Sequence, residues 1–218
     1  MMLLQYEDAI NDFSKAIEVK PDDILAYMNR GISKQRSGDF VNAILDFNKV
    51  VELDPLKFDT YTYRADARSE LKDYENALID YEKSIELNPK YGVAYFNRGF
   101  MKSSQMGLMK ESIDDYTKAI ELGYGDVAYL NRGIAKLRSK DNNGAINDFN
   151  QALKINNKDS SAYYNRGKAY SGKGKFKNAI SDFLKTLDLN QNIIPKIGIY
   201  RNLAFNYGKM NDKKNSCL

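Results

Sequence analysis

The chain has 218 residues, of which 43% are apolar and 28% charged, and its formal net charge is +4 at neutral pH. This composition excludes an intrinsically disordered chain, because apolar residues are numerous enough to build a core. Histidine is absent, so the chain lacks the usual general base and the usual metal ligand, and we expect no enzymatic activity and no cofactor.

The single cysteine and the lack of long apolar runs bear on cellular location. Cys217 cannot form an intrachain disulfide, which favours a reducing compartment, and we expect an intracellular, cytoplasmic protein. No run of 18 apolar residues is present and the first ten residues lack the features of a signal peptide, so we expect no membrane insertion. Basic charge is concentrated in the C-terminal half, since residues 1–109 carry 14 Lys or Arg against 18 Asp or Glu, and residues 110–218 carry 19 against 11.

Taken in chain order, the predicted elements are helices that recur in pairs. A first helix at 3–20 has the pattern of a second helix from a partial unit, and an unpaired first helix is predicted at about 195–209. Between them we predict five full units, at about 24–57, 58–91, 92–125, 126–159 and 160–193. Short turns are predicted inside the units at SGD, KDY, KDN and GKF, and connections this short make neighbouring helices antiparallel.

The units are defined by a period of 34 residues. Small residues mark the first helices: Gly31, Ala65, Gly99, Gly133 and Gly167. A second small series marks the second helices: Ala9, Ala43, Ala77, Ser112, Ala145 and Ala179. Aromatic residues follow four positions later: Phe13, Phe47, Tyr81, Tyr116, Phe149 and Phe183. Glycine inside a helix costs roughly 1 kcal/mol relative to alanine, so we infer that these glycines allow a neighbouring helix to approach closely.

This pattern resembles the tetratricopeptide repeat, a helix-turn-helix of 34 residues. In residues 24–57 the matching residues are Tyr27, Gly31, Ala43, Phe47, Val50 and Pro55. The resemblance extends over essentially the whole chain, with departures at the arginines that precede the small residues and in the longer last connection, NQNIIPKI. It implies an all-α fold, an α-solenoid in which stacked helix-turn-helix hairpins form a right-handed superhelix, as one array over residues 1–218.

The segment AYMNRG at residues 26–31 returns as AYFNRG, AYLNRG and AYYNRG. Helical periodicity places the fourth and third letters on the side opposite the tyrosine and glycine, which the resemblance makes the concave wall. The asparagines resemble the asparagine series in the superhelix of O-linked N-acetylglucosamine transferase, and amides can both donate to and accept from a peptide backbone. We predict a peptide-binding surface made of Asn29, Asn97, Asn131, Asn165, Asn202, Met28, Phe96, Phe100, Leu130, Ile134 and Tyr164.

Two alternatives stay open for these residues: that the asparagines bond only to neighbouring helices, and that some of the apolar residues pack between units. The second full unit departs from the others, because Tyr63 replaces the asparagine and Asp59, Asp66 and Glu70 form an acidic stretch. The slots of a chaperone-docking carboxylate clamp hold apolar or acidic residues here, which disfavours that ligand in this register.

Arginines and aspartates recur with the same period. The arginines are Arg30, Arg64, Arg98, Arg132 and Arg166, and the aspartates are Asp12, Asp46, Asp80, Asp115, Asp148 and Asp182. We predict structural ion pairs between helices. The segment GKAYSGKG at 167–174 mimics a phosphate loop, but it lies in a repeat helix and lacks the final Ser or Thr, so we set nucleotide binding aside.

The function predicted is a non-enzymatic protein–protein interaction scaffold that binds a peptide segment or a partner helix in the concave groove. An alternative is self-assembly through uncapped terminal helices, with an apolar face that includes Leu3, Leu4, Ile10 and Phe13. A third, which we favour least, is nucleic-acid binding by the basic C-terminal half. The unpaired terminal helices also lead us to expect a fragment of a larger array.

Overall fold

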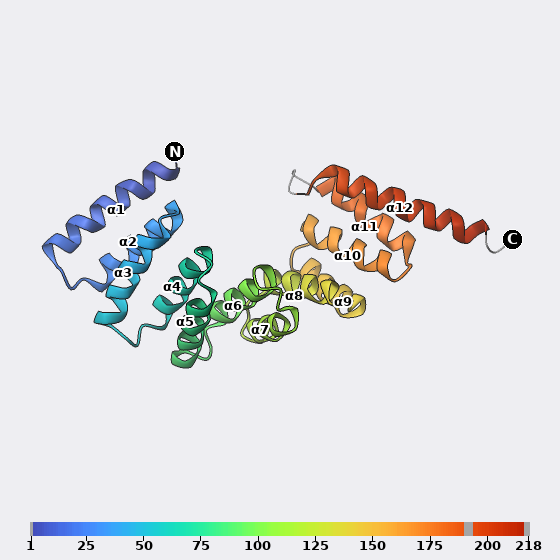
Figure 1. The fold of residues 1–218 in the computed structure, drawn as a ribbon. Coiled ribbons are helices and arrows are strands. Elements are labelled where there is room, and N and C mark those ends of the chain that lie inside the picture. The colour runs from blue at the N-terminus through green and yellow to red at the C-terminus, as the bar shows by residue number, and fades with distance from the viewer. Residues whose placement is uncertain (1, 190–193, 216–218) are drawn as a thin grey trace. The chain divides into compact units, whose positions relative to one another are not determined.

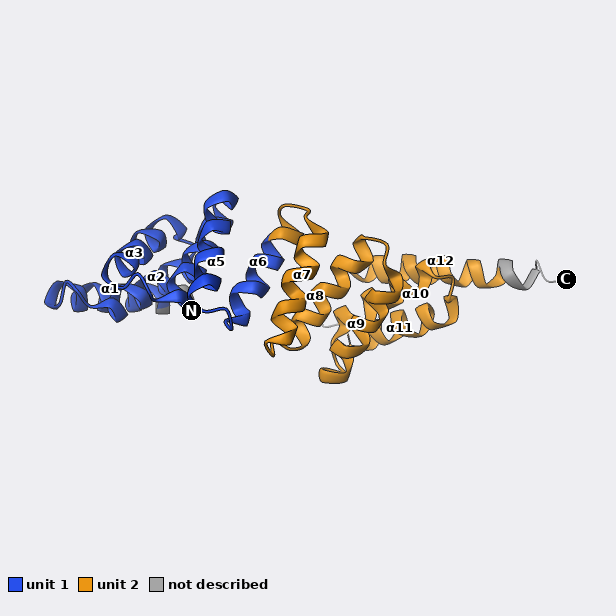
Figure 2. Ribbon diagram, turned by 90° about the horizontal axis from the view of Figure 1, so that it is seen from below, with its two compact units in different colours: residues 1–101 blue, residues 102–218 orange. Residues whose placement is uncertain are grey.

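The computed structural model describes residues 2–189 and 194–215, and within these ranges it contains twelve α-helices and no strand (Figure 1). The predicted all-α fold is therefore confirmed, and its stacked helix hairpins form an α-solenoid. The side chains of Leu3 and Leu4, the connection at 190–193 and Cys217 lie outside the described part. The chain divides into two compact units, Met1–Met101 and Lys102–Leu218, coloured separately in Figure 2.

Unit 1 consists of α1 to α5 and most of α6. Their bounds are α1 Met2–Val19, α2 Ile24–Ser37, α3 Phe40–Leu53, α4 Phe58–Glu70, α5 Tyr74–Leu87 and α6 Gly92–Ser104. Unit 2 contains α7 Met109–Glu121, α8 Asp126–Arg138, α9 Asn142–Ile155, α10 Ser160–Gly172, α11 Phe176–Leu189 and α12 Lys196–Asn215. Hairpins α2–α3 and α4–α5 in unit 1, and α8–α9 and α10–α11 in unit 2, pack along their length.

Polar caps and left-handed turn residues delimit these helices. Asp23 accepts hydrogen bonds from the backbone N–H groups of Leu25 and Ala26 at 3.0 and 3.1 Å, and Asp159 caps α10 in the same way. Each predicted intra-unit turn has one residue with positive φ: Gly38, Lys72, Lys140 and Gly174. Glycine adopts this conformation without strain, whereas the two lysines adopt it at a cost in free energy.

The small residues of the first helices lie against aromatic rings of the second helices. A Cβ atom added to Gly31 would be 2.7 Å from Phe47 Cε1, and one added to Gly133 would be 2.6 Å from Phe149 Cε1. Both rings are fully buried. The glycines therefore allow close helix packing, as predicted. In α12, the corresponding Ala204 is exposed, because no described helix follows α12 to cover it.

The predicted Arg–Asp pairs are confirmed in four hairpins. In α8–α9, Arg132 Nε and Nη2 donate to the two carboxylate oxygens of Asp148 at 2.9 and 2.7 Å, while Lys136 also contacts that carboxylate at 2.8 Å. The equivalent pairs are Arg30–Asp46, Arg64–Asp80 and Arg166–Asp182. Their aspartates are 2 to 5% exposed. Hydrogen bonding to Asp46 raises the pKa of Arg30 above its usual value, which keeps that guanidinium charged.

Candidate functional site

In unit 2 the predicted asparagines are held along their own helices. Asn131 Nδ2 donates to the Val127 carbonyl at 2.8 Å, and Asn165 Nδ2 donates to the Ser161 carbonyl at 2.9 Å. Both side chains are half-buried. Among the described residues, the side-chain hydrogen bond of each asparagine is donated by Nδ2, and its amide oxygen accepts none. Each amide thus has a fixed direction, an open acceptor and a second N–H available.

The third asparagine of unit 2 also connects two first helices. Asn202 Nδ2 donates to the Gly198 carbonyl at 2.8 Å and to the Tyr164 hydroxyl at 3.2 Å, which links α12 to α10. The Tyr164 ring packs edge-on against Phe183, with the ring centroids 5.8 Å apart. Tyr164 therefore has a packing role in addition to the predicted binding role.

The apolar residues predicted for this surface are partly used by the core. Leu130 and Ile134 are half-buried and pack against buried residues of α9 and α10, including Ile146 and Ala169. The first-helix face of unit 2, by which we mean Leu130, Asn131, Ile134, Asn165, Lys168 and Asn202, therefore combines anchored amides with apolar surface that remains partly accessible.

Unit 1 presents the predicted residues differently. Met28 is 5% exposed, lies in the core with Phe47, and receives the Thr60 hydroxyl on its sulfur at 3.7 Å, so we leave it out of the proposed surface. Asn29 is exposed. Phe96 is half-buried, and Phe100 is 47% exposed.

Asn97 is engaged by a neighbouring helix, which is one of the two alternatives left open by the sequence. Its Nδ2 lies 3.1 and 3.0 Å from the two carboxylate oxygens of Asp66 on α4, and the Tyr81 hydroxyl donates to the same carboxylate at 2.5 Å. Burial raises the pKa of Asp66 to about 6, against the lowering effect of the hydrogen bonds from Tyr81 and Asn97, and nearby Glu70 raises it further. The amide of Asn97 is thus part of an internal polar cluster.

An open pocket lies on unit 2 between α8 and α10. Its volume is about 460 Å³, and it is lined by Ile134, Leu137, Arg138, Asn142, Asn165, Lys168 and Gly172. Two predicted site residues therefore share it with Arg138 and Lys168, which the sequence analysis did not select. The 34-residue period could have identified Lys168 as a site residue, because Lys168 occupies the repeat position of Ile134.

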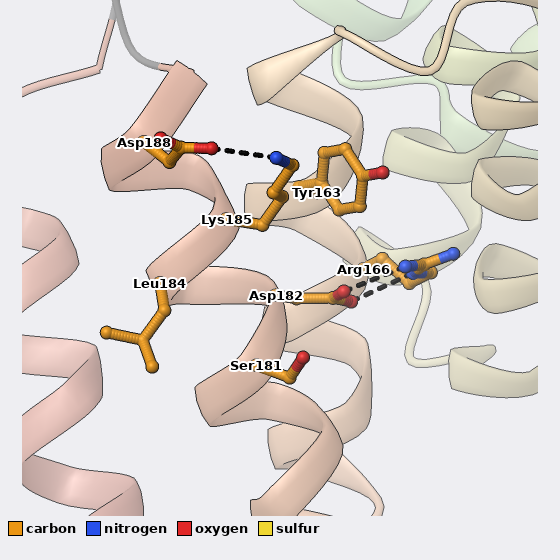
Figure 3. Close-up of a pocket in the computed structure, with 7 residues that line it drawn as sticks. All are labelled: Tyr163, Arg166, Ser181, Asp182, Leu184, Lys185 and Asp188. Atoms are coloured by element: carbon orange, nitrogen blue, oxygen red, sulfur yellow. Dashed lines mark hydrogen bonds and ion pairs between the residues drawn. The ribbon is translucent and has the colours of Figure 1, made fainter.

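A second depression lies over α10 and α11 (Figure 3). Its charged groups are paired with one another: Arg166 with Asp182, and Lys185 with Asp188 at 2.7 Å. Because the lining ion pairs already satisfy its charges, this depression has little electrostatic preference for a ligand. Among the described residues, no group of three or more acidic, Cys or His side chains is placed to hold a metal ion. In the same part of the chain, no helix is long and apolar enough to cross a bilayer.

Helix hairpins that repeat and stack in series define an α-solenoid. Family models described as "TPR repeat" match residues 5–38 and 135–174, and models described as "Tetratricopeptide repeat" match 58–91 and 160–193. The chain belongs to the tetratricopeptide-repeat family, and this fold makes it a protein–protein interaction scaffold.

Similar proteins include serine/threonine-protein phosphatase T of Trypanosoma brucei brucei, which is 40% identical over 78 residues, 36% of this chain and 16% of that protein. The chain spans 6 to 16% of the length of the curated relatives it matches, so their activities are not transferred to it. Among solved structures, YrrB, "a TPR protein with an unusual peptide-binding site", superposes with a TM-score of 0.67 at 20% identity over 83% of this chain and 93% of that chain. MamA gives 0.68 at 24% identity over 79% and 98%. These likenesses show the fold.

Proposed function

We propose that the chain is a non-enzymatic scaffold that binds an extended peptide segment on the first-helix face of unit 2. The observation that carries this proposal is the common state of Asn131 and Asn165, each anchored to its own helix and each with an open amide oxygen. Two such amides at one repeat spacing can bond to the main chain of a peptide whatever its side chains are.

The surroundings of these amides support an extended ligand. An extended strand turns alternate side chains to one surface, so main-chain bonds to the amides leave side chains free to contact the accessible parts of Leu130 and Ile134. A peptide-binding site is also the feature named for YrrB, which shares this fold. The remaining predicted members, Asn29, Phe96 and Phe100, are proposed as ligand contacts of unit 1.

The experiment uses random dodecapeptides displayed on phage, selected against the full chain, with the affinity of a selected peptide measured by fluorescence anisotropy. Loss of two neutral hydrogen bonds at about 1 kcal/mol each predicts that Asn131→Ala/Asn165→Ala binds roughly 30-fold more weakly. The matched control is Asn147→Ala/Asn178→Ala, because both are exposed asparagines on the second helices. Equal affinity of the two double variants, or a failure to select any peptide, would contradict the proposal.

The two other predicted functions stay predictions. Self-assembly depends in part on Leu3 and Leu4, whose side chains lie outside the described residues. Nucleic-acid binding depends on the basic charge of residues 110–218, and it is included below as an outcome of the binding experiments.

A further inference from the structure

We propose that the pocket between α8 and α10 binds an acidic side chain, Asp or Glu, of the peptide, next to an apolar one. This inference rests on the proposed function and adds the chemistry of its ligand. We call the pocket, lined chiefly by Ile134, Leu137, Arg138, Asn165 and Lys168, the basic pocket.

The two cations of the basic pocket form no ion pair with any described residue. Lys168 is exposed, and its ammonium lies 5.6 Å from the centre of the Tyr164 ring. Arg138 is also exposed, and its Nη1 donates to the Ser103 carbonyl at 3.4 Å. This bond uses one of the five N–H donors of the guanidinium, so the others are available to a ligand. Both side chains can therefore bind a carboxylate without breaking an existing ion pair.

The other cations on these two helices already have carboxylate partners. Arg132 and Lys136 of α8 share the buried carboxylate of Asp148, and Arg166 of α10 is paired with Asp182. The aspartates of α9 and α11 are thus committed to structural pairs, and the basic pocket keeps its net positive charge. This distinguishes it from the depression over α10 and α11, in which Lys185 has Asp188 as its partner (Figure 3).

The other residues of the basic pocket favour an apolar peptide side chain next to the acidic one. Ile134 and Leu137 give an apolar wall, and Asn165 brings the amide that we propose to hold the peptide backbone. A guanidinium binds a carboxylate through two parallel hydrogen bonds, and an ammonium binds it as a point charge. Beside the pocket, Lys173 donates to Asn143 and adds a third positive charge. Basic peptides are disfavoured by the same charges.

The acidic-ligand proposal is tested with the peptides selected above and with copies in which Asp and Glu are replaced by Asn and Gln. We expect acidic residues to be enriched among the selected peptides, and we expect each replaced copy to bind about tenfold more weakly, because a hydrogen bond to a charged group is lost. Lys168→Gln/Arg138→Gln should weaken binding of the acidic peptide by a similar factor and should leave binding of the replaced copy unchanged.

The matched control is Lys154→Gln/Lys177→Gln, which removes the same charge from exposed positions on α9 and α11. If it weakens binding as much as the pocket variant does, attraction is general and the proposal is overturned. If selected peptides lack acidic residues while Asn131→Ala/Asn165→Ala still weakens them, the acidic-ligand proposal fails and the proposed function stands. If single-stranded DNA of matched length binds more tightly than the peptides and loses affinity in the pocket variant, the pocket serves nucleic acid and the proposal is overturned.

Discussion

Unit 1 and unit 2 place asparagine at the same repeat position and use it differently. Asn97 in unit 1 donates to Asp66 of the preceding hairpin, and Tyr81 closes the cluster. Asn165 in unit 2 has Ile134 at the corresponding place in the preceding hairpin, and its amide bonds to its own helix. Where the preceding hairpin has a carboxylate, Asp66, the asparagine is bound inside the protein. Where it has an apolar side chain, Ile134, the amide oxygen of the asparagine is available to a ligand.

The ion pairs that join the two helices of a hairpin do not differ between the two units. Arg64–Asp80 in unit 1 and Arg132–Asp148 in unit 2 have the same two-bond geometry and the same burial. The repeat therefore keeps the chemistry of its packing positions and varies that of its exposed face. The predictions below test both halves of this contrast, from the largest expected effect to the smallest.

Removal of a buried aspartate should destabilise both units to the same extent. Asp80→Ala and Asp148→Ala each leave a guanidinium uncompensated in a largely buried place, with an expected loss of roughly 3–5 kcal/mol in the free energy of unfolding, measured with urea. Asp188→Ala, which breaks an exposed pair with Lys185, should cost less than about 0.5 kcal/mol. A loss confined to one unit would break the claim that packing positions are equivalent.

The Asp66 cluster should make the stability of unit 1 depend on pH. The folded pKa of about 6 lies above the ordinary value of 3.8, so folding favours the protonated form. Asp66 then contributes stability that is fully present below about pH 4 and is lost as the pH rises through about 6. The total change is up to about 3 kcal/mol.

The measurement is the unfolding free energy of the wild type minus that of Asp66→Asn, between about pH 4 and 7. This difference should fall as the pH rises, because the asparagine cannot ionise. The exposed neighbour provides a control, since Glu70→Gln should keep most of the pH dependence. A difference that does not change with pH would refute the assignment of a raised pKa to Asp66.

Close helix packing at the small positions predicts opposite effects for two Gly→Ala changes. Gly133→Ala brings a methyl group onto the buried ring of Phe149 and should destabilise by roughly 1–3 kcal/mol in thermal or urea unfolding. Gly208→Ala in α12 meets no atom within 4 Å and should stabilise by up to about 1 kcal/mol through helix propensity. Two stabilising changes would show that the Gly133 contact relaxes without cost.

The smallest effect is expected at the left-handed turn residues, one in each unit. Lys72 and Lys140 have φ of 63° and 65°, so Lys72→Gly and Lys140→Gly should each stabilise by roughly 0.5–1 kcal/mol. Lys173, with φ of −93°, is the control, since glycine there relieves no strain and should not stabilise. Equal effects at the three lysines would contradict the turn geometry.

The sequence predicted the features that recur with the period. The helix hairpins, the contact of Gly31 with Phe47 and the pairing of Arg132 with Asp148 each follow from two residue types that repeat at a constant separation. Periodicity is sufficient in these cases because every hairpin solves the same packing problem.

Features that depend on a single unit could not be predicted in this way. Met28 is buried in contact with Thr60 of the next first helix, and Asn97 is engaged because the carboxylate of Asp66 on α4 accepts hydrogen bonds from its amide. That Lys168 lines a pocket with Ile134 and Arg138 follows only from the packing of α10 beside α8. These are contacts between hairpins, and the residues that make them differ from one hairpin to the next.

The central claim is that the first-helix face of unit 2 is the ligand-binding surface, and a crystal structure of the chain with its tightest selected peptide tests it most directly. We predict hydrogen bonds between the peptide backbone and the side-chain amides of Asn131 and Asn165, with a peptide carboxylate within about 4 Å of Lys168 or Arg138. A peptide bound instead to the exposed face of α9 and α11, with those amides uncontacted, would contradict it.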